Sequence, residues 1–253
     1  LSILDEALQQ LPHHNYIYFA DSANAPYGDK PPQWISERSL QICRYLVEQD
    51  CSAIVVACNT ATAEAIATIR STLDIPIIGV EPGIKPAAMQ SQNGIVGVLA
   101  TEATLNSDKF NALLATLPEH CQFIKQAGAG LVPLIEAGLV ETPEMQALLR
   151  SHLKPIQDQG ADTLVLGCTH YPFLKKMIRA VVGDSMTLID TSDAVVRQLL
   201  RQMHQQGLIV SSKHSPKLSL LSTANADTLE AMAERLLHRD LSKYAIYTKT
   251  LTL

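Results

Sequence analysis

Runs of consecutive apolar residues alternate along this chain with segments in which apolar residues recur at helical spacing. The runs predict nine strands, at 16–20, 53–57, 76–80, 94–100, 122–126, 163–167, 186–189, 217–222 and 244–248. The helical spacing predicts helices at 34–47, 61–69, 144–156 and 193–203. Because unbroken apolar runs are typical of strands buried on both faces, we expect mostly parallel sheets covered by helices, the doubly wound α/β class.

The first eleven residues predict one more helix, with Ser2 as its N-cap and Asp5 completing a weak capping box. An α/β pattern that opens on a helix predicts that a strand normally precedes that helix. Near the other end of the chain, residues 205–217 predict an exposed loop.

Two of the predicted strands end in similar sequences. Residues 52–66 read SAIVVACNTATAEAI and residues 162–176 read DTLVLGCTHYPFLKK, so that Cys58 and Cys168 take equivalent places. Each is followed by a predicted helix and by a strand that closes with an acidic residue. The pattern predicts two pseudo-symmetric domains built on one βα unit, the first comprising 1–81 and 190–253 and the second 82–189.

Both cysteines are expected just before a helix, at the carboxyl end of a strand, where open α/β sheets bind ligands. A helix N-terminus presents unpaired N–H groups and about half a positive charge, which attract carboxylates and lower the pKa of a thiol. We therefore expect each half to offer a reactive thiol and a cradle for an anion.

Composition limits the classes of protein to which this chain can belong. A chain of 253 residues fits two domains, and 47% apolar residues are enough for a substantial core. A net charge of −5 with scattered basic residues argues against a nucleic-acid partner, and the absence of an apolar run of about 18 residues argues against a membrane span. An odd cysteine count of five without a CxxC pair predicts a reduced, cytoplasmic protein with free thiols.

Several roles are open to the thiols. Cys43, Cys51 and Cys121 are interpreted as packing residues, the usual role of a lone cysteine. Zinc binding by Cys58, Cys168 and His170 lacks a fourth ligand, and we expect no metal site. A Cys168–His170 nucleophile pair would leave Cys58 idle. Two thiols facing one substrate instead suit inversion of a stereocentre, in which one removes a proton from Cα and the other returns one to the opposite face.

Five motifs, in this order, resemble those of glutamate racemases in the aspartate/glutamate racemase superfamily. They are ADSANAPYGDKP at 20–31, ACNTAT at 57–62, ATEATLNS at 100–107, LVPLIEAG at 131–138 and GCTHYP at 167–172. The resemblance implies an active site in a cleft between the domains and cofactor-independent racemisation of L-glutamate to D-glutamate. D-Glutamate of this origin serves peptidoglycan synthesis, and with it the cell wall and cell shape.

The resemblance also implies roles for individual residues. Cys58 and Cys168 match the two bases, and His170 and Glu136 match a pair that supports the second base. The residues matched to substrate binding are Tyr27, Gly28, Asn59, Thr60, Thr101, Thr104 and Thr169, together with His170. These motifs contain hydroxyls, an amide and helix-start N–H groups but no arginine, so the carbanion needs a closed, dry site, and we expect closure by domain motion.

One departure from the family pattern lies at the front. The family opens on a strand that ends in Asp-Ser, whose Asp is thought to assist the first cysteine, and Asp21 belongs to the next strand and does not match it. If that segment is absent, we expect severe loss of activity. Aspartate racemase, another amino-acid racemase of the superfamily and a non-enzymatic binding module are the rival interpretations, and homodimer formation is left open.

Overall fold

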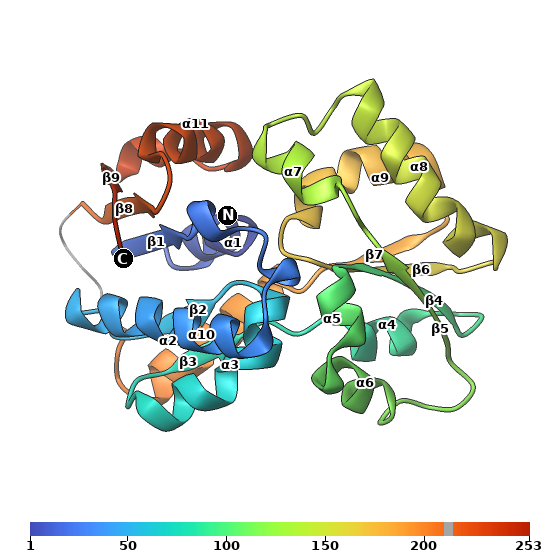
Figure 1. The fold of residues 1–253 in the computed structure, drawn as a ribbon, viewed down its shortest axis with the longest axis horizontal. Helices are drawn as coiled ribbons and strands as arrows, with labels where there is room; N and C mark the ends of the chain where they lie inside the picture. The colour runs from blue at the N-terminus through green and yellow to red at the C-terminus, as the bar shows by residue number, and fades with distance from the viewer. Residues whose placement is uncertain (210–214) are drawn as a thin grey trace. The chain divides into compact units, whose positions relative to one another are not determined.

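The computed structural model describes residues 1–209 and 215–253, which divide into two compact units (Figure 1). The first unit comprises Leu1–Ala57, Glu64–Val80 and Ser192–Leu253, and the second comprises Cys58–Ala63 and Glu81–Thr191. Part of the predicted loop at 205–217, residues 210–214, lies outside the described residues. Within the described part, no helix is both long and apolar enough to cross a membrane.

The second unit is built on one parallel sheet of four strands in the order β5-β4-β6-β7. The strands are β4 (Ile95–Ala100), β5 (Gln122–Ala127), β6 (Thr163–Gly167) and β7 (Thr187–Ile189). In β4, Val96, Val98 and Ala100 point to one core and Leu99 to another, and all four are fully buried. The predicted burial on both faces is therefore confirmed for this sheet.

Helices cover both faces of this sheet (Figure 1). Residues of α7 (Leu131–Glu136), α8 (Pro143–Asp158) and α9 (Lys175–Val182) pack into the core that contains Leu99. Residues of α4 (Ile84–Gln90), α5 (Glu102–Asn106) and α6 (Asp108–Leu114) pack into the core that contains Val96 and Val98. This arrangement is the doubly wound α/β architecture expected from the sequence.

The first unit divides its parallel strands between two sheets. One has the order β1-β8-β9, with β1 (Tyr16–Ala20), β8 (Lys217–Ser222) and β9 (Ala245–Thr250), and the other pairs β2 (Ile54–Val56) with β3 (Ile77–Gly79). The helices are α1 (Ser2–Gln10), α2 (Pro32–Glu48), α10 (Ser192–Gln205), α11 (Ala226–Leu236) and most of α3 (Asn59–Thr72). With these, each of the nine predicted strands has its counterpart in the structure.

Helix α1 contributes to two hydrophobic clusters of the first unit. Its residues Ile3 and Ala7 pack in a cluster with β3 and α10, whereas Leu4 and Leu8 pack in a cluster with β8 and α11. All four side chains are buried. The helix therefore joins the hydrophobic cores of the two sheets of this unit.

Two local predictions are wrong. Ser2 is the first residue of α1 and not its N-cap, because the Asp5 N–H already donates to the Leu1 carbonyl at 2.8 Å. No α-helix directly follows Cys168 either, since the chain turns and enters a short 3₁₀ helix, η3 (Tyr171–Leu174), before α9. The i→i+3 bonds from the Tyr171 N–H to the Cys168 carbonyl, 3.0 Å, and from the Phe173 N–H to the His170 carbonyl, 3.2 Å, close this tighter turn.

Candidate active site

Cys58 lies between the end of β2 and the first residue of α3, as the sequence predicts. The Ala61 N–H donates to Cys58 Sγ at 3.5 Å, so the thiol faces the first turn of the helix. Burial nevertheless raises the pKa of Cys58. Hydrogen bonds from Ala61 and Thr60 lower this pKa and Cys168 raises it, but the effect of burial is the largest. The expected lowering of the Cys58 pKa by the helix N-terminus is therefore wrong, because burial outweighs the N–H groups.

Cys168 follows β6 and is 9% exposed. Its Sγ lies 3.7 Å from His170 Nδ1, and His170 Nε2 lies 2.6 Å from Glu136 Oε1. Burial lowers the His170 pKa, but the bonds to Cys168 and Glu136 outweigh it and raise this pKa to about 9. In turn, the bond from His170 lowers the pKa of Glu136. The predicted trio of thiol, imidazole and carboxylate thus forms a continuous chain of contacts.

Three threonines meet beside the start of α3. Thr60 Oγ1 lies 3.2 Å from Thr101 Oγ1 and 3.2 Å from Thr104 Oγ1, and Thr101 Oγ1 lies 2.8 Å from Thr104 Oγ1. Thr101 is the N-cap of α5, as predicted, and accepts from the Thr104 N–H. Hydroxyls both donate and accept, so this cluster can meet a carboxylate without a cationic side chain.

Asn59 adds an acceptor next to this cluster. The residue is 6% exposed, and its Oδ1 has no hydrogen-bond partner among the described residues. An unpaired buried acceptor costs about 1–3 kcal/mol, which a donor on a ligand would recover. An ammonium group is one such donor.

The register of the sheet in the second unit explains how part of this group comes together. Ala100 pairs with Gly167, so β4 and β6 end side by side, and Thr101 and Cys168 follow at neighbouring carboxyl ends. A Cβ at Gly167 would lie 2.7 Å from the Ala100 Cβ, which accounts for glycine at this position.

Three further predicted residues are Thr169, Tyr27 and Gly28. Thr169 lies in the turn between Cys168 and His170, and Tyr27 and Gly28 belong to the first unit, in the 3₁₀ helix η2 (Tyr27–Asp29). The other cysteines are free thiols, and burial raises the pKa of Cys43 to about 11. Nowhere in residues 1–209 and 215–253 do three His, Cys, Asp or Glu side chains gather as they would around a metal ion.

One ion pair near a predicted site residue was not anticipated from the sequence. Arg38 pairs with Asp21, whose carboxylate also binds Tyr27. An available clue was the position of Arg38 on the same stripe of α2 as the buried residues Ile35, Ser39 and Cys43, where an arginine needs a partner. The identity of that partner, on another element, is not visible in the sequence pattern.

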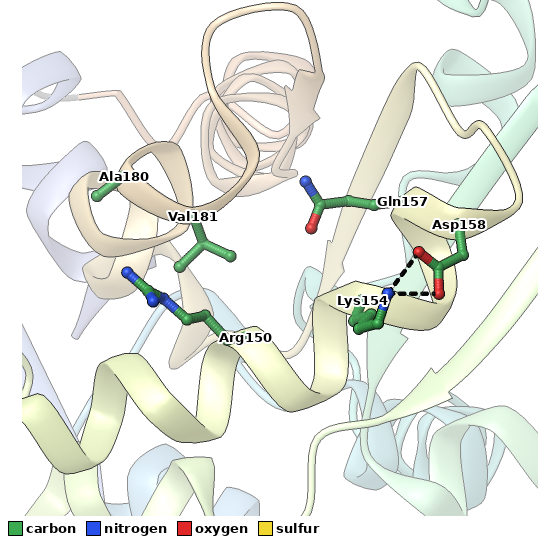
Figure 2. A pocket seen from close by; sticks show the side chains of 6 residues that line it. All are labelled: Arg150, Lys154, Gln157, Asp158, Ala180 and Val181. Carbon is green, nitrogen blue, oxygen red and sulfur yellow. Dashed lines mark hydrogen bonds and ion pairs between the residues drawn. The ribbon is translucent and has the colours of Figure 1, made fainter.

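A hollow of about 450 Å³ opens on the second unit between α8 and α9 (Figure 2). Its lining consists of Arg150, Lys154, Gln157, Asp158, Ala180 and Val181. Lys154 is already paired with Asp158 within α8, at 2.8 Å. This hollow contains none of the predicted site residues, and it is distinct from the group around the two thiols.

Comparison with known proteins places these features in a family. The model described as Asp/Glu/Hydantoin racemase matches residues 2–199. A glutamate racemase of Cupriavidus pinatubonensis is 51% identical over 94% of this chain and 88% of its own length. A glutamate racemase isoform from Bacillus anthracis has a TM-score of 0.87 at 28% identity, with 100% of this chain and 93% of that chain covered. Escherichia coli glutamate racemase, in complex with L-glutamate and the activator UDP-MurNAc-Ala, has a TM-score of 0.84 at 30% identity, covering 99% and 94%.

Proposed function

The chain belongs to the Asp/Glu/hydantoin racemase family, and on this premise we propose that it interconverts L-glutamate and D-glutamate with Cys58 and Cys168 as the two bases. The protein is an isomerase, as its glutamate racemase relatives are. The observation that carries the two-base assignment is that both thiols belong to the second unit and each follows a parallel strand, with Cys168 in contact with the His170–Glu136 pair. The threonine hydroxyls beside the start of α3 and the unpaired acceptor of Asn59 supply neutral groups that suit an amino acid.

Substrate binding follows from the chemistry of those groups. The Asn59 Oδ1 accepts from the substrate ammonium, because it is a buried acceptor without a partner among the described residues. The hydroxyls of Thr60, Thr101 and Thr104 and the N–H groups at the start of α3 hold the carboxylates. Tyr27, Gly28 and Thr169 are kept as substrate-binding residues because their motifs match the family.

The proton transfers need one thiolate and one thiol. In one direction of the reaction, we assign the proton-donor role to Cys58, whose pKa is raised by burial, and the role of the base that removes the Cα proton from the opposite face to Cys168. The two sulfurs have exchanged protonation states at the end of the step, and the reverse reaction uses them in the opposite roles. His170 contacts Cys168 directly and is held in place by Glu136. It can therefore exchange a proton with the Cys168 sulfur.

The proposal extends to the setting of the reaction. Racemisation proceeds without a cofactor or metal, in the cytoplasm where thiols stay reduced, and its product supplies peptidoglycan synthesis. Aspartate is the competing substrate, since hydroxyl and amide donors do not by themselves measure the length of a side chain.

A direct test follows circular dichroism while purified protein is incubated with L-glutamate, without pyridoxal phosphate or metal and with the thiols reduced. We expect the signal of L-glutamate to decay to zero as the racemic mixture forms. In deuterium oxide, the product should carry deuterium at Cα. A stable signal would overturn the proposal, and a faster rate on L-aspartate than on L-glutamate would reassign the substrate.

A further inference from the structure

Asp21 follows β1 and binds side chains from three directions. Arg38 donates to both of its oxygens, from Nε to Oδ2 at 2.9 Å and from Nη2 to Oδ1 at 2.6 Å. The Tyr27 hydroxyl donates to Oδ2 at 2.6 Å, Asn24 Nδ2 donates at 3.0 Å, and Thr223 Oγ1 donates at 2.9 Å. The carboxylate thus joins its own loop, a helix and the end of β8.

The Asp21 carboxylate is buried, and both of its oxygens accept hydrogen bonds. The side chains of Asp21 and Arg38 are 7% and 9% exposed, and a charge pair at that depth is stable only when its hydrogen bonds are satisfied. Burial alone would raise the Asp21 pKa, but the bonds from Arg38, Tyr27, Asn24 and Thr223 outweigh it and lower this pKa to about 2. Asp21 therefore stays anionic at neutral pH and does not serve as a proton acceptor.

The loop after Asp21 has no hydrophobic anchor of its own. It consists of two single-turn 3₁₀ helices, η1 (Ser22–Asn24) and η2 (Tyr27–Asp29), and neither contains a buried residue. Hydrogen bonds hold this loop instead of buried apolar side chains. Besides the bonds to Asp21, the Ala23 N–H donates to Thr223 Oγ1 at 3.1 Å. An aromatic contact is added by Tyr27 and Trp34, whose rings meet edge to face with centroids 5.5 Å apart.

We propose that Asp21, paired with Arg38, is a positioning residue that holds the Tyr27–Gly28 turn in the conformation that binds substrate. This inference rests on the proposed function, in which Tyr27 and Gly28 bind glutamate. Asp21 acts through the Tyr27 hydroxyl, and its loss should weaken substrate binding much more than it slows proton transfer.

The main test replaces the charge while keeping the shape, with Asp21→Asn. We expect KM for glutamate to rise about tenfold, the effect of losing charge-assisted hydrogen bonds, while kcat stays within about twofold. Because Asp21 stays ionised, the KM ratio should be constant from about pH 6 to about pH 9. A ratio that changes with pH in this range would mean that Asp21 exchanges protons in the reaction, and the positioning role would be wrong.

A second readout does not depend on activity. Trp34 is the chain's single tryptophan, and it contacts Tyr27, so its fluorescence reports the turn. We expect acrylamide to quench Trp34 more strongly in Asp21→Asn than in the wild type. If the wild type does not racemise glutamate, the proposed function fails, while unchanged quenching in the variant would by itself overturn the positioning of the turn.

Tyr27→Phe and Tyr16→Phe form a matched pair that separates positioning from stability and does not depend on how well the Asp21 variant folds. Each loses one part-buried hydroxyl of the first unit, but Tyr16 donates to the carbonyls of Ala7 and Leu11, at 2.9 and 2.8 Å, away from the loop. Tyr27→Phe should raise KM about threefold with little change in the unfolding temperature, and Tyr16→Phe should lower that temperature with KM unchanged. Equal KM values in the two variants would contradict the inference.

Discussion

The two compact units arrange their parallel strands and hydrophobic cores differently. In the second unit a single parallel sheet packs against a hydrophobic cluster on each face, and its inner strands β4 and β6 each pair with a neighbour on both sides. In the first unit the described strands form two smaller sheets, and α1 contributes apolar residues to the cores of both. In the first unit a helix therefore contributes to the packing of both sheets, and polar bonds such as those of Asp21 hold the loop that follows β1.

The comparison also separates two kinds of functional residue. The thiols, the threonine cluster and the His170–Glu136 pair all belong to the second unit, where β4 and β6 fix the residues that follow them. The Tyr27 loop belongs to the first unit, where hydrogen bonds hold it without buried side chains. Substitutions at these sites of the second unit should thus affect proton transfer or carboxylate binding, whereas substitutions in the Tyr27 loop should affect substrate binding alone.

The largest expected effect comes from the thiols. Cys58→Ser and Cys168→Ser should each lower the racemisation rate by about 10²- to 10⁴-fold or more, because a hydroxyl is too weak a base to replace a thiolate. The unfolding temperature should stay near that of the wild type. Cys51→Ser, a partly exposed free thiol in the first unit, is the matched control and should retain full activity.

Deuterium incorporation at Cα sharpens this test. Each variant should lose exchange unequally for L- and D-glutamate, since each thiol faces one side of Cα in the proposed mechanism. Equal losses for both enantiomers in both variants would argue against two bases with fixed faces.

The next effect tests the two units as folding blocks. Leu8→Ala in α1 and Leu153→Ala in α8 remove side chains that are 4% and 0% exposed, and each should cost about 2–5 kcal/mol of stability. Hydrogen exchange should accelerate in β1 and β8 for the first variant and in β4 and β6 for the second. Faster exchange in both units for either variant would mean that they unfold as one block.

A smaller effect is expected from pH. The His170 pKa is about 9 in the folded protein against an ordinary value of 6.5, so the folded state gains stability from His170 that is complete below about pH 6.5. This contribution is lost as the pH rises toward 9. Chemical denaturation across this range should show a steeper decline for the wild type than for Glu136→Gln, which lacks the carboxylate that bonds to His170. Parallel declines would show that Glu136 does not raise the His170 pKa.

The smallest effect is expected at the hollow between α8 and α9. Lys154→Ala removes an exposed ion pair, which contributes about 0–1 kcal/mol, and should leave kcat and KM unchanged. A clear rise in KM for glutamate would mean that this hollow takes part in substrate binding. It would contradict the conclusion that the hollow is separate from the group around the thiols.

Much of the fold was predictable because it is local. Apolar runs predicted the nine strands that the described residues form, and the N-cap role of Thr101 followed from its place before Glu102. The wrong predictions concern competition between forces, since a helix start favours a thiolate at Cys58 but burial opposes it more strongly. The role of Ser2 failed for a finer reason, because a shift of one residue moves a side chain out of the capping position.

The sequence predicted which residues belong to the candidate site, but it did not predict which of their side chains contact one another. Motifs identified Thr60, Thr101 and Thr104 individually, but only the fold brings their hydroxyls within 3.2 Å of one another. The same holds for Arg38, whose bond to Asp21 joins elements separated along the chain. The strand that the pattern predicts ahead of α1 stays a prediction.

The pairing of Ala100 with Gly167 has a stereochemical consequence. Successive residues of a strand point to opposite sides of the sheet, so parity along the chain decides which way the residue after β6 projects. Inserting or deleting one residue within β6 would turn the sulfur of Cys168 away while leaving the strand able to pair. The handedness of the proton transfer proposed for this thiol is therefore set by the number of residues in the strand as much as by the thiol itself.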